Sequence, residues 1–142
     1  MAPKVNAHDA LAVDTAAAEQ GLALMTDMLG ADLVERITAR NTMAPKWQRF
    51  TTEVLFGEVW QGEVLPLRIR SMLTVAVLAS MTRPHELENH MRAAMVNGVT
   101  AEELVEIVQH VGFYAGWPSA GEALTILRRI LDEATAADSA SR

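Results

Sequence analysis

The chain contains no cysteine. This absence excludes disulfides, thiolate nucleophiles, cysteine-ligated zinc and thiol redox chemistry. The sequence also lacks a run of about 18 consecutive apolar residues, the length that a membrane-spanning helix needs. Its first twenty residues have neither the apolar core nor the cleavage pattern of a signal peptide. We therefore expect a cytoplasmic protein without a membrane partner.

Basic runs and aromatic residues are also scarce. The 12 Lys and Arg residues are outnumbered by 18 Asp and Glu residues, giving a net charge of −6. The chain has no stripe of basic residues that could follow a phosphate backbone, so we do not expect nucleic acid as a partner. Aromatic residues make up 5% of the chain, whereas Ala, Leu, Val and Met dominate its 50% hydrophobic content. This composition favours helices over sheets.

The length of 142 residues predicts one all-α domain covering residues 1–142. Residues 1–13 and 135–142 lack helical periodicity, so we expect both ends to be frayed. Between them, helix signals indicate about six to seven helices. The first helix follows Asp14 and stops at Gly30, and a short second helix covers 31–40.

Four further segments have helical periodicity. Residues 45–60 form an amphipathic segment that Gly57 weakens. Pro66 suits the first turn of the following helix. That helix is apolar on every side between Met72 and Ala79. Pro84 opens a helix that ends at Gly98. Two more helices complete the series: one covers 101–115 after the capping box of Thr100 and Glu103, and the last is amphipathic and carries Leu124, Ile126, Leu127, Ile130 and Leu131. A helix that is apolar all round predicts a central position in the bundle.

One pair of side chains has the spacing of an acid–base pair. Glu86 and His90 are four residues apart, so they share one helix face, with Asn97 too far along to join them directly. The carboxylate can orient the imidazole and raise its pKa. The alternative is a surface pair that stabilises the helix by a few tenths of a kcal/mol. The spacing alone leaves both interpretations open.

Other polar and aromatic residues admit two interpretations each. Arg68 and Arg70 point to nearly opposite sides of their helix, so at most one can face a given pocket, and both could instead extend into solvent. Arg83 could be a loop cation. Glu106, His110 and Tyr114 form a flank that is either solvated or part of an interface. Two tryptophans, Trp60 and Trp117, lie near glycines at helix ends and could line a pocket or cap the core.

From Gly57 to about Leu131 the chain resembles the carboxymuconolactone decarboxylase family. The resemblance is carried by GEVW at 57–60, RIRSMLTVAVLASM at 68–81, RPHELENHMRAAMVNGVTAEEL at 83–104 and YAGWP at 114–118. It implies an alkylhydroperoxidase-like helical bundle that assembles as a homo-trimer or homo-hexamer. The peroxidase branch of this superfamily uses two cysteines, a histidine and a relay glutamate. Here Arg83, Glu86, His90 and Ser71 stand at those four positions, so the resemblance is not to the peroxidase branch. The decarboxylase branch likewise carries Arg, Glu and His at the first three.

The resemblance implies decarboxylation of a carboxylated butenolide, 4-carboxymuconolactone or a similar compound, to an enol-lactone in the catabolism of aromatic compounds. No metal or other cofactor is implied, and the histidines show no metal-ligand spacing. The implied partner is a small lactone or carboxylate. His90 would donate the proton or stabilise the enolate, with Glu86 orienting it. Arg70 or Arg83 would bind carboxylate, and Trp60, Tyr114 and Trp117 would line the pocket.

The chain departs from the family pattern where the dedicated decarboxylases have Leu-Asp-Arg. It has Leu65, Pro66 and Leu67, so an acid and a cation are lost together. Two alternatives therefore stay open. One is a different cofactor-free enzyme, an isomerase or cyclase acting on an enolisable lactone or a polyketide-like substrate. The other is a non-catalytic oligomeric binding protein.

Overall fold

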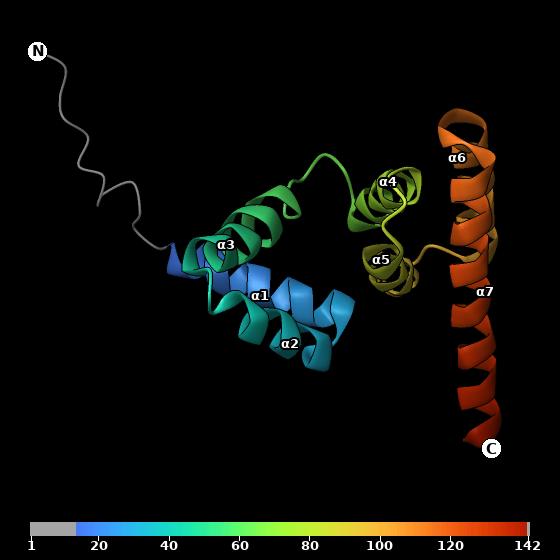
Figure 1. The fold of residues 1–142 in the computed structure, drawn as a ribbon. Helices are drawn as coiled ribbons and strands as arrows, with labels where there is room; N and C mark the ends of the chain where they lie inside the picture. Colours follow the sequence, from blue (N-terminus) through green and yellow to red (C-terminus); the bar gives the residue numbers. More distant parts are fainter. Residues whose placement is uncertain (1–13, 142) are drawn as a thin grey trace, which may run out of the picture. The chain divides into compact units, whose positions relative to one another are not determined.

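A computed structural model describes residues 14–141, which form seven α-helices and one π-helix and contain no strand (Figure 1). The prediction of an all-α protein is confirmed. The helices divide into two compact units, the first ending at Gly62 and the second beginning at Glu63. That the chain forms one domain stays a prediction, and the expected fraying of residues 1–13 falls outside the described residues.

The first unit contains α1 (Thr15–Leu29), α2 (Ala31–Asn41), α3 (Pro45–Arg49) and the π-helix η2 (Phe50–Val59). The predicted start of α1 is confirmed, because the Asp14 carboxylate accepts a hydrogen bond from the Ala17 N–H at 3.1 Å. The predicted stop is also confirmed. Gly30 has a φ of +83°, a backbone conformation that favours glycine.

The prediction of one α-helix over 45–60 is wrong. The helix changes to π-type hydrogen bonding at Phe50, and the Trp60 N–H donates to the Leu55 carbonyl at 2.9 Å, five residues back. Gly57 indicates in the sequence that the helix is irregular here, but the π-type hydrogen bonding accompanies the packing of η2 against α1. Gly21 and Gly57 let the backbones of α1 and η2 approach more closely than any side chain would allow.

The second unit contains α4 (Leu67–Ser80), α5 (Pro84–Val96), α6 (Ala101–Ala115) and α7 (Trp117–Ala140). The predicted capping box of α6 is confirmed in both directions, since Glu103 N–H donates to Thr100 Oγ1 at 3.2 Å and Thr100 N–H donates to the Glu103 carboxylate at 2.9 Å. One cluster of buried residues, drawn from all four helices, forms the core of this unit. Its largest fully buried members are Val75, Leu87, Met91, Leu104, Val108 and Leu127.

Two predicted helix boundaries need correction. Pro66 is the N-cap of α4 rather than a first-turn residue. At the other end of the unit, residues 135–140 are helical, although we expected fraying there. Alanine has the highest helix propensity, and Ala136, Ala137 and Ala140 make up half of this segment. Helix propensity therefore continues where hydrophobic periodicity stops.

The apolar helix α4 is buried on one side. Val75 and Ala79 are inaccessible to solvent or nearly so, whereas Leu73 and Val77 are each more than half exposed. Within its unit α4 packs against α5, α6 and α7, as a central helix does, but this side of it stays exposed in the single chain. No helix within residues 14–141 is both long and apolar enough to cross a membrane.

Candidate active site

Helix α5 presents three side chains of the predicted site along one face. Arg83 is its N-cap, Glu86 lies in its first turn, and His90 lies one turn further. The steps of three and four residues keep the three side chains on the same side of the helix. Pro84 at the first helical position fixes where the helix begins, and therefore where this face points.

His90 differs from the surface member of a helix pair. Its side chain is partly buried, and its Nδ1 atom is shielded from solvent. Burial lowers the pKa of His90 below its ordinary value, and the nearby Glu86 carboxylate opposes that effect. Glu86 itself is exposed. Because desolvation is the larger cause, it shifts the His90 imidazole toward its neutral form.

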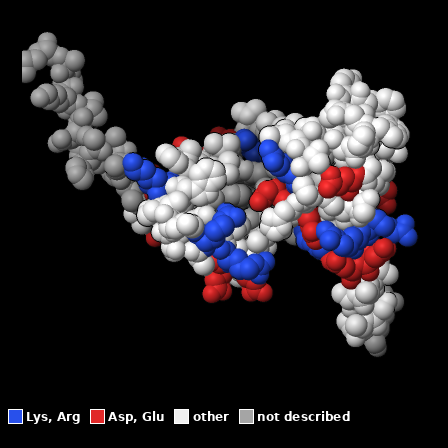
Figure 2. Space-filling model, viewed as in Figure 1, with Lys and Arg blue, Asp and Glu red and all other residues white. Residues whose placement is uncertain are grey.

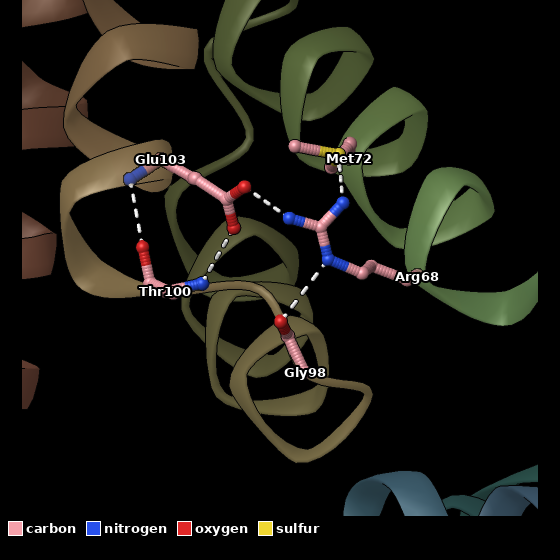
Figure 3. A network of polar contacts seen from close by, with 5 residues as sticks. All are labelled: Arg68, Met72, Gly98, Thr100 and Glu103. Carbon is pink, nitrogen blue, oxygen red and sulfur yellow. Dashed lines mark hydrogen bonds and ion pairs between the residues drawn. The ribbon is translucent and has the colours of Figure 1, made fainter.

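Arg68 is occupied by contacts that hold helices together (Figure 3). Its guanidinium forms an ion pair with Glu103, donates to the Gly98 carbonyl at 3.1 Å and lies 3.8 Å from the sulfur of Met72. Arg70 points elsewhere and donates from Nε to the Leu65 carbonyl at 3.0 Å. The two arginines therefore have different partners; that they point to opposite sides of α4 stays a prediction.

The two candidate carboxylate-binding arginines lie at opposite ends of α4. Arg70 is in its first turn and Arg83 follows its last residue, Ser80. The ten residues from Arg70 to Ser80 rise by about 15 Å. Arg83 is thus adjacent in the chain to the first turn of α5, which carries Glu86, whereas Arg70 is near the far end of α4.

The three predicted pocket-lining aromatics have different environments. Trp60, in the first unit, is buried and stacks on Phe56 with ring centroids 5.8 Å apart. Tyr114 is 81% exposed and stacks on His110, while Trp117 is 66% exposed. Their part in a substrate pocket stays a prediction. A hydrogen bond of 3.1 Å between the hydroxyls of Thr82 and Ser119 joins the α4–α5 turn to the start of α7.

A groove of about 460 Å³ lies between α4 and α6. Its walls are apolar, and Glu106 and His110 contribute its polar groups. Glu106 and His110 are exposed as well as bordering this groove, so both interpretations of the α6 flank stay open. The residues that line the groove are Ile69, Met72, Leu73, Ala76, Glu106, Ile107, His110 and Val111.

Sequence reasoning missed one buried polar contact of α5. Asn97, the C-cap of this helix, donates from Nδ2 to the hydroxyl of Ser71 on α4 at 2.9 Å. Ser71 is 1% exposed. A serine within an apolar helix and an asparagine at a helix end are each ordinary, so only their pairing would have indicated this bond.

Charged side chains on the second unit are interspersed by sign. Arg92 on α5 donates to Glu133 on α7 at 2.6 Å, and Arg129 on α7 forms an ion pair with Glu88 on α5. In Figure 2, blue and red atoms accordingly lie side by side over α7. Within residues 14–141, no group of three or more His, Asp or Glu side chains is placed to hold a metal ion.

Comparison with known proteins places this arrangement in a family. The model of the carboxymuconolactone decarboxylase family matches residues 45–129, which include Arg83, Glu86 and His90. A 4-carboxymuconolactone decarboxylase of Acinetobacter baylyi is 36% identical over 116 residues, covering 81% of this chain and 87% of that protein. A nitrosuccinic acid decarboxylase of Metarhizium robertsii is 33% identical over 116 residues, covering 81% of each chain. The chain belongs to the carboxymuconolactone decarboxylase family, a family of decarboxylases.

Proposed function

We propose that the protein removes CO₂ from a small carboxylic acid that carries its own electron sink, without a cofactor, at the α5 face formed by Arg83, Glu86 and His90. The observation that carries the proposal is the position of His90. It is partly buried and lies one turn from a carboxylate on a helix that the family model covers.

A carboxylated butenolide of the 4-carboxymuconolactone type is the substrate we favour. Its C–CO₂⁻ bond breaks, and the released electron pair passes through the C=C bond into the lactone carbonyl. The resulting dienolate takes a proton at the α carbon, which gives the enol-lactone. The substrate supplies the electron sink, so the protein needs only to bind the acid, stabilise the enolate oxygen and deliver a proton.

The name of the second relative favours a second candidate substrate. Nitrosuccinic acid contains no lactone, but its nitro group can accept the electron pair released by loss of CO₂. The two relatives together support decarboxylation next to an electron-withdrawing group more strongly than they support one ring system. The loss of an acid and a cation at Pro66 and Leu67 fits a substrate with a different charge.

His90 would act first as a hydrogen-bond donor to the developing oxyanion. Because burial lowers the pKa of His90, most of the imidazole is neutral at pH 7, and a neutral N–H can still stabilise an enolate. The protonated imidazole, populated at lower pH, would be the stronger proton donor. The dependence of kcat on pH separates these roles, since an imidazolium donor requires kcat to rise as the pH falls toward the pKa of His90.

Arg83 is the better candidate for the carboxylate-binding cation. It is exposed at the N-terminal end of α5, where the helix dipole also favours negative charge. Arg70 lies near the other end of α4. We therefore expect Arg83→Ala to raise KM more than Arg70→Ala does, with a smaller effect on kcat.

The test measures CO₂ release from 4-carboxymuconolactone and from nitrosuccinic acid. His90→Ala should lower kcat by roughly 10²- to 10⁴-fold, the usual effect of losing a general acid or base. Glu86→Gln should have a smaller effect, because the imidazole remains. The matched control is His110→Ala, since His110 also follows a glutamate by four residues but lies on α6.

Near-full turnover by His90→Ala, or an equal loss in His110→Ala, would contradict the assigned site. Binding of both acids without turnover by the wild type would instead indicate the non-catalytic binding protein. Turnover of an enolisable lactone without CO₂ release would indicate the isomerase or cyclase alternative.

We also propose a cytoplasmic homo-trimer or homo-hexamer, with Trp60, Tyr114 and Trp117 near the substrate. The half-exposed Leu73 and Val77 of α4 support assembly, because a second copy would remove this apolar surface from water. Sedimentation of a 15.5 kDa monomer alone at micromolar concentration would contradict the oligomer.

A further inference from the structure

Helix α5 is attached to α4 at both of its ends. At its start, the turn 81–83 joins the two helices, and the Arg83 N–H donates to the Leu78 carbonyl at 3.1 Å. At its end, two side chains of α4 hold consecutive residues. Ser71 accepts from Asn97 at 2.9 Å, and Arg68 donates to the Gly98 carbonyl at 3.1 Å. His90 lies between these two attachments.

The attachment at the end of α5 joins rigid pieces. Gly98 has a φ of +87°, its N–H donates to Met95 at 3.1 Å, and the Val99 N–H donates to Ala94 at 2.9 Å. These two bonds are the Schellman ending of a helix, which fixes the direction in which the chain leaves. On the α4 side, Arg68 and Ser71 are three residues apart and therefore share a helix face.

The distance from this attachment to His90 is short and follows a continuous helix. Seven residues separate His90 from Asn97, which is two turns and about 10.5 Å. At about 100° per residue, both side chains lie on the same face of α5. The segment between them contains neither glycine nor proline, so movement at Asn97 is transmitted to His90 rather than absorbed by a kink.

We propose that Ser71 and Asn97 are positioning residues for His90: their hydrogen bond holds the end of α5 against α4 and thereby sets how deeply the His90 imidazole lies in the protein. This inference rests on the proposed function only for its effect on catalysis. The positioning itself is a property of the fold and can be measured without a substrate.

The burial of Ser71 explains why loss of its hydrogen bond to Asn97 should move the end of α5. The Ser71 hydroxyl is almost inaccessible to water, so losing Asn97 would leave a buried polar group without the bond that Asn97 now provides. The end of α5 would then move away from α4, which would admit water both to Ser71 and to the face that carries His90. Of the charged groups near His90, Glu86 affects its pKa and would remain in place.

The experiment compares the pKa of the His90 imidazole, measured by NMR titration, in the wild type, Asn97→Ala and Ser71→Ala. Both variants should raise that pKa toward the ordinary value of about 6.5, because more water reaches the ring. The double variant should behave like either single variant, since each removes the same bond. In the assay of CO₂ release, kcat should fall about tenfold with KM little changed, the signature of a misplaced catalytic group.

The matched control is Glu133→Gln. It removes an ion pair from Arg92 that also holds α5, but to α7 instead of α4. If the Ser71–Asn97 bond were purely structural, Ser71→Ala and Asn97→Ala would lower stability without changing the pKa of His90. We expect that result for Glu133→Gln. Circular dichroism checks that each variant is folded.

Three results would overturn the proposal. The first is an unchanged His90 pKa in folded Asn97→Ala and Ser71→Ala. The second is a pKa change of equal size in Glu133→Gln. The third is failure of both Ser71→Ala and Asn97→Ala to fold, which would make the bond structural only. A raised pKa in the variants, combined with full activity of His90→Ala, would instead uphold the positioning and refute the proposed function.

Discussion

Replacing Gly21 by alanine should destabilise the first unit, although alanine is the better helix former. A Cβ atom at Gly21 would lie 1.8 Å from the Thr52 carbonyl oxygen and 2.8 Å from the Gly57 nitrogen. Real Cβ contacts essentially never fall below 3.0 Å, so the Thr52 backbone would have to retreat by about 1.2 Å. The obstacle is backbone of η2, which cannot rotate away as the end of a flexible side chain could.

The magnitude follows from two opposing effects. Glycine to alanine in a helix interior contributes about 1 kcal/mol of stability through helix propensity. Forcing an extra carbon into a closely packed contact costs typically about 1–3 kcal/mol, and more where the backbone must move. Because the atoms that a Cβ at Gly21 would meet all belong to the backbone, we expect a net destabilisation of about 2 kcal/mol.

Gly121→Ala is the matched control for this prediction. Gly121 is also a helical glycine, in α7, but a Cβ atom there would meet nothing within 4 Å. The same substitution should therefore stabilise the protein by about 1 kcal/mol. Urea denaturation followed by circular dichroism gives both free energies of unfolding. If Gly21→Ala were as stable as the wild type, or were stabilised as Gly121→Ala is expected to be, the close approach of α1 and η2 would be refuted.

Three further measurements test other parts of the molecule. Burial lowers the pKa of His90, so between that lowered pKa and about 6.5 the unfolded chain binds more protons than the native protein. The free energy of unfolding should thus fall as the pH drops below about 6.5. Urea denaturation from pH 7.5 to 5.5 should show a shallower fall for His90→Gln than for the wild type. Equal pH dependence of the unfolding free energy in the two proteins would contradict this. Thr100→Ala should destabilise by about 1 kcal/mol in urea, since it removes the side chain that accepts from the Glu103 N–H; an unchanged midpoint would argue against the capping box. Prolonged dialysis against EDTA should leave CO₂ release unchanged, and activity that returned only with added metal would refute a cofactor-free reaction.

Local signals in the sequence determined most helix boundaries. Asp14 and Gly30 bound α1, and Thr100 and Glu103 start α6, because caps and positive-φ glycines act through hydrogen bonds and backbone conformation within a few residues. The same reasoning failed for the tail 135–140. There the helix continues after hydrophobic periodicity ends, because periodicity marks only a helix that packs on a core, whereas helix propensity acts residue by residue.

The sequence also placed Glu86 and His90 on one helix face, and the resemblance to a family then added Arg83. Only the tertiary structure decided what surrounds them. The ion pair of Arg68 with Glu103 and the bond between Ser71 and Asn97 each join segments that are far apart in the chain. The burial of His90 likewise depends on the helices that pack around it. The π-helix also depends on a segment far away in the chain, because it accompanies the contact between Gly21 and Gly57. Spacing along a helix is fixed by the local backbone, whereas desolvation and long-range hydrogen bonds depend on which helices pack together.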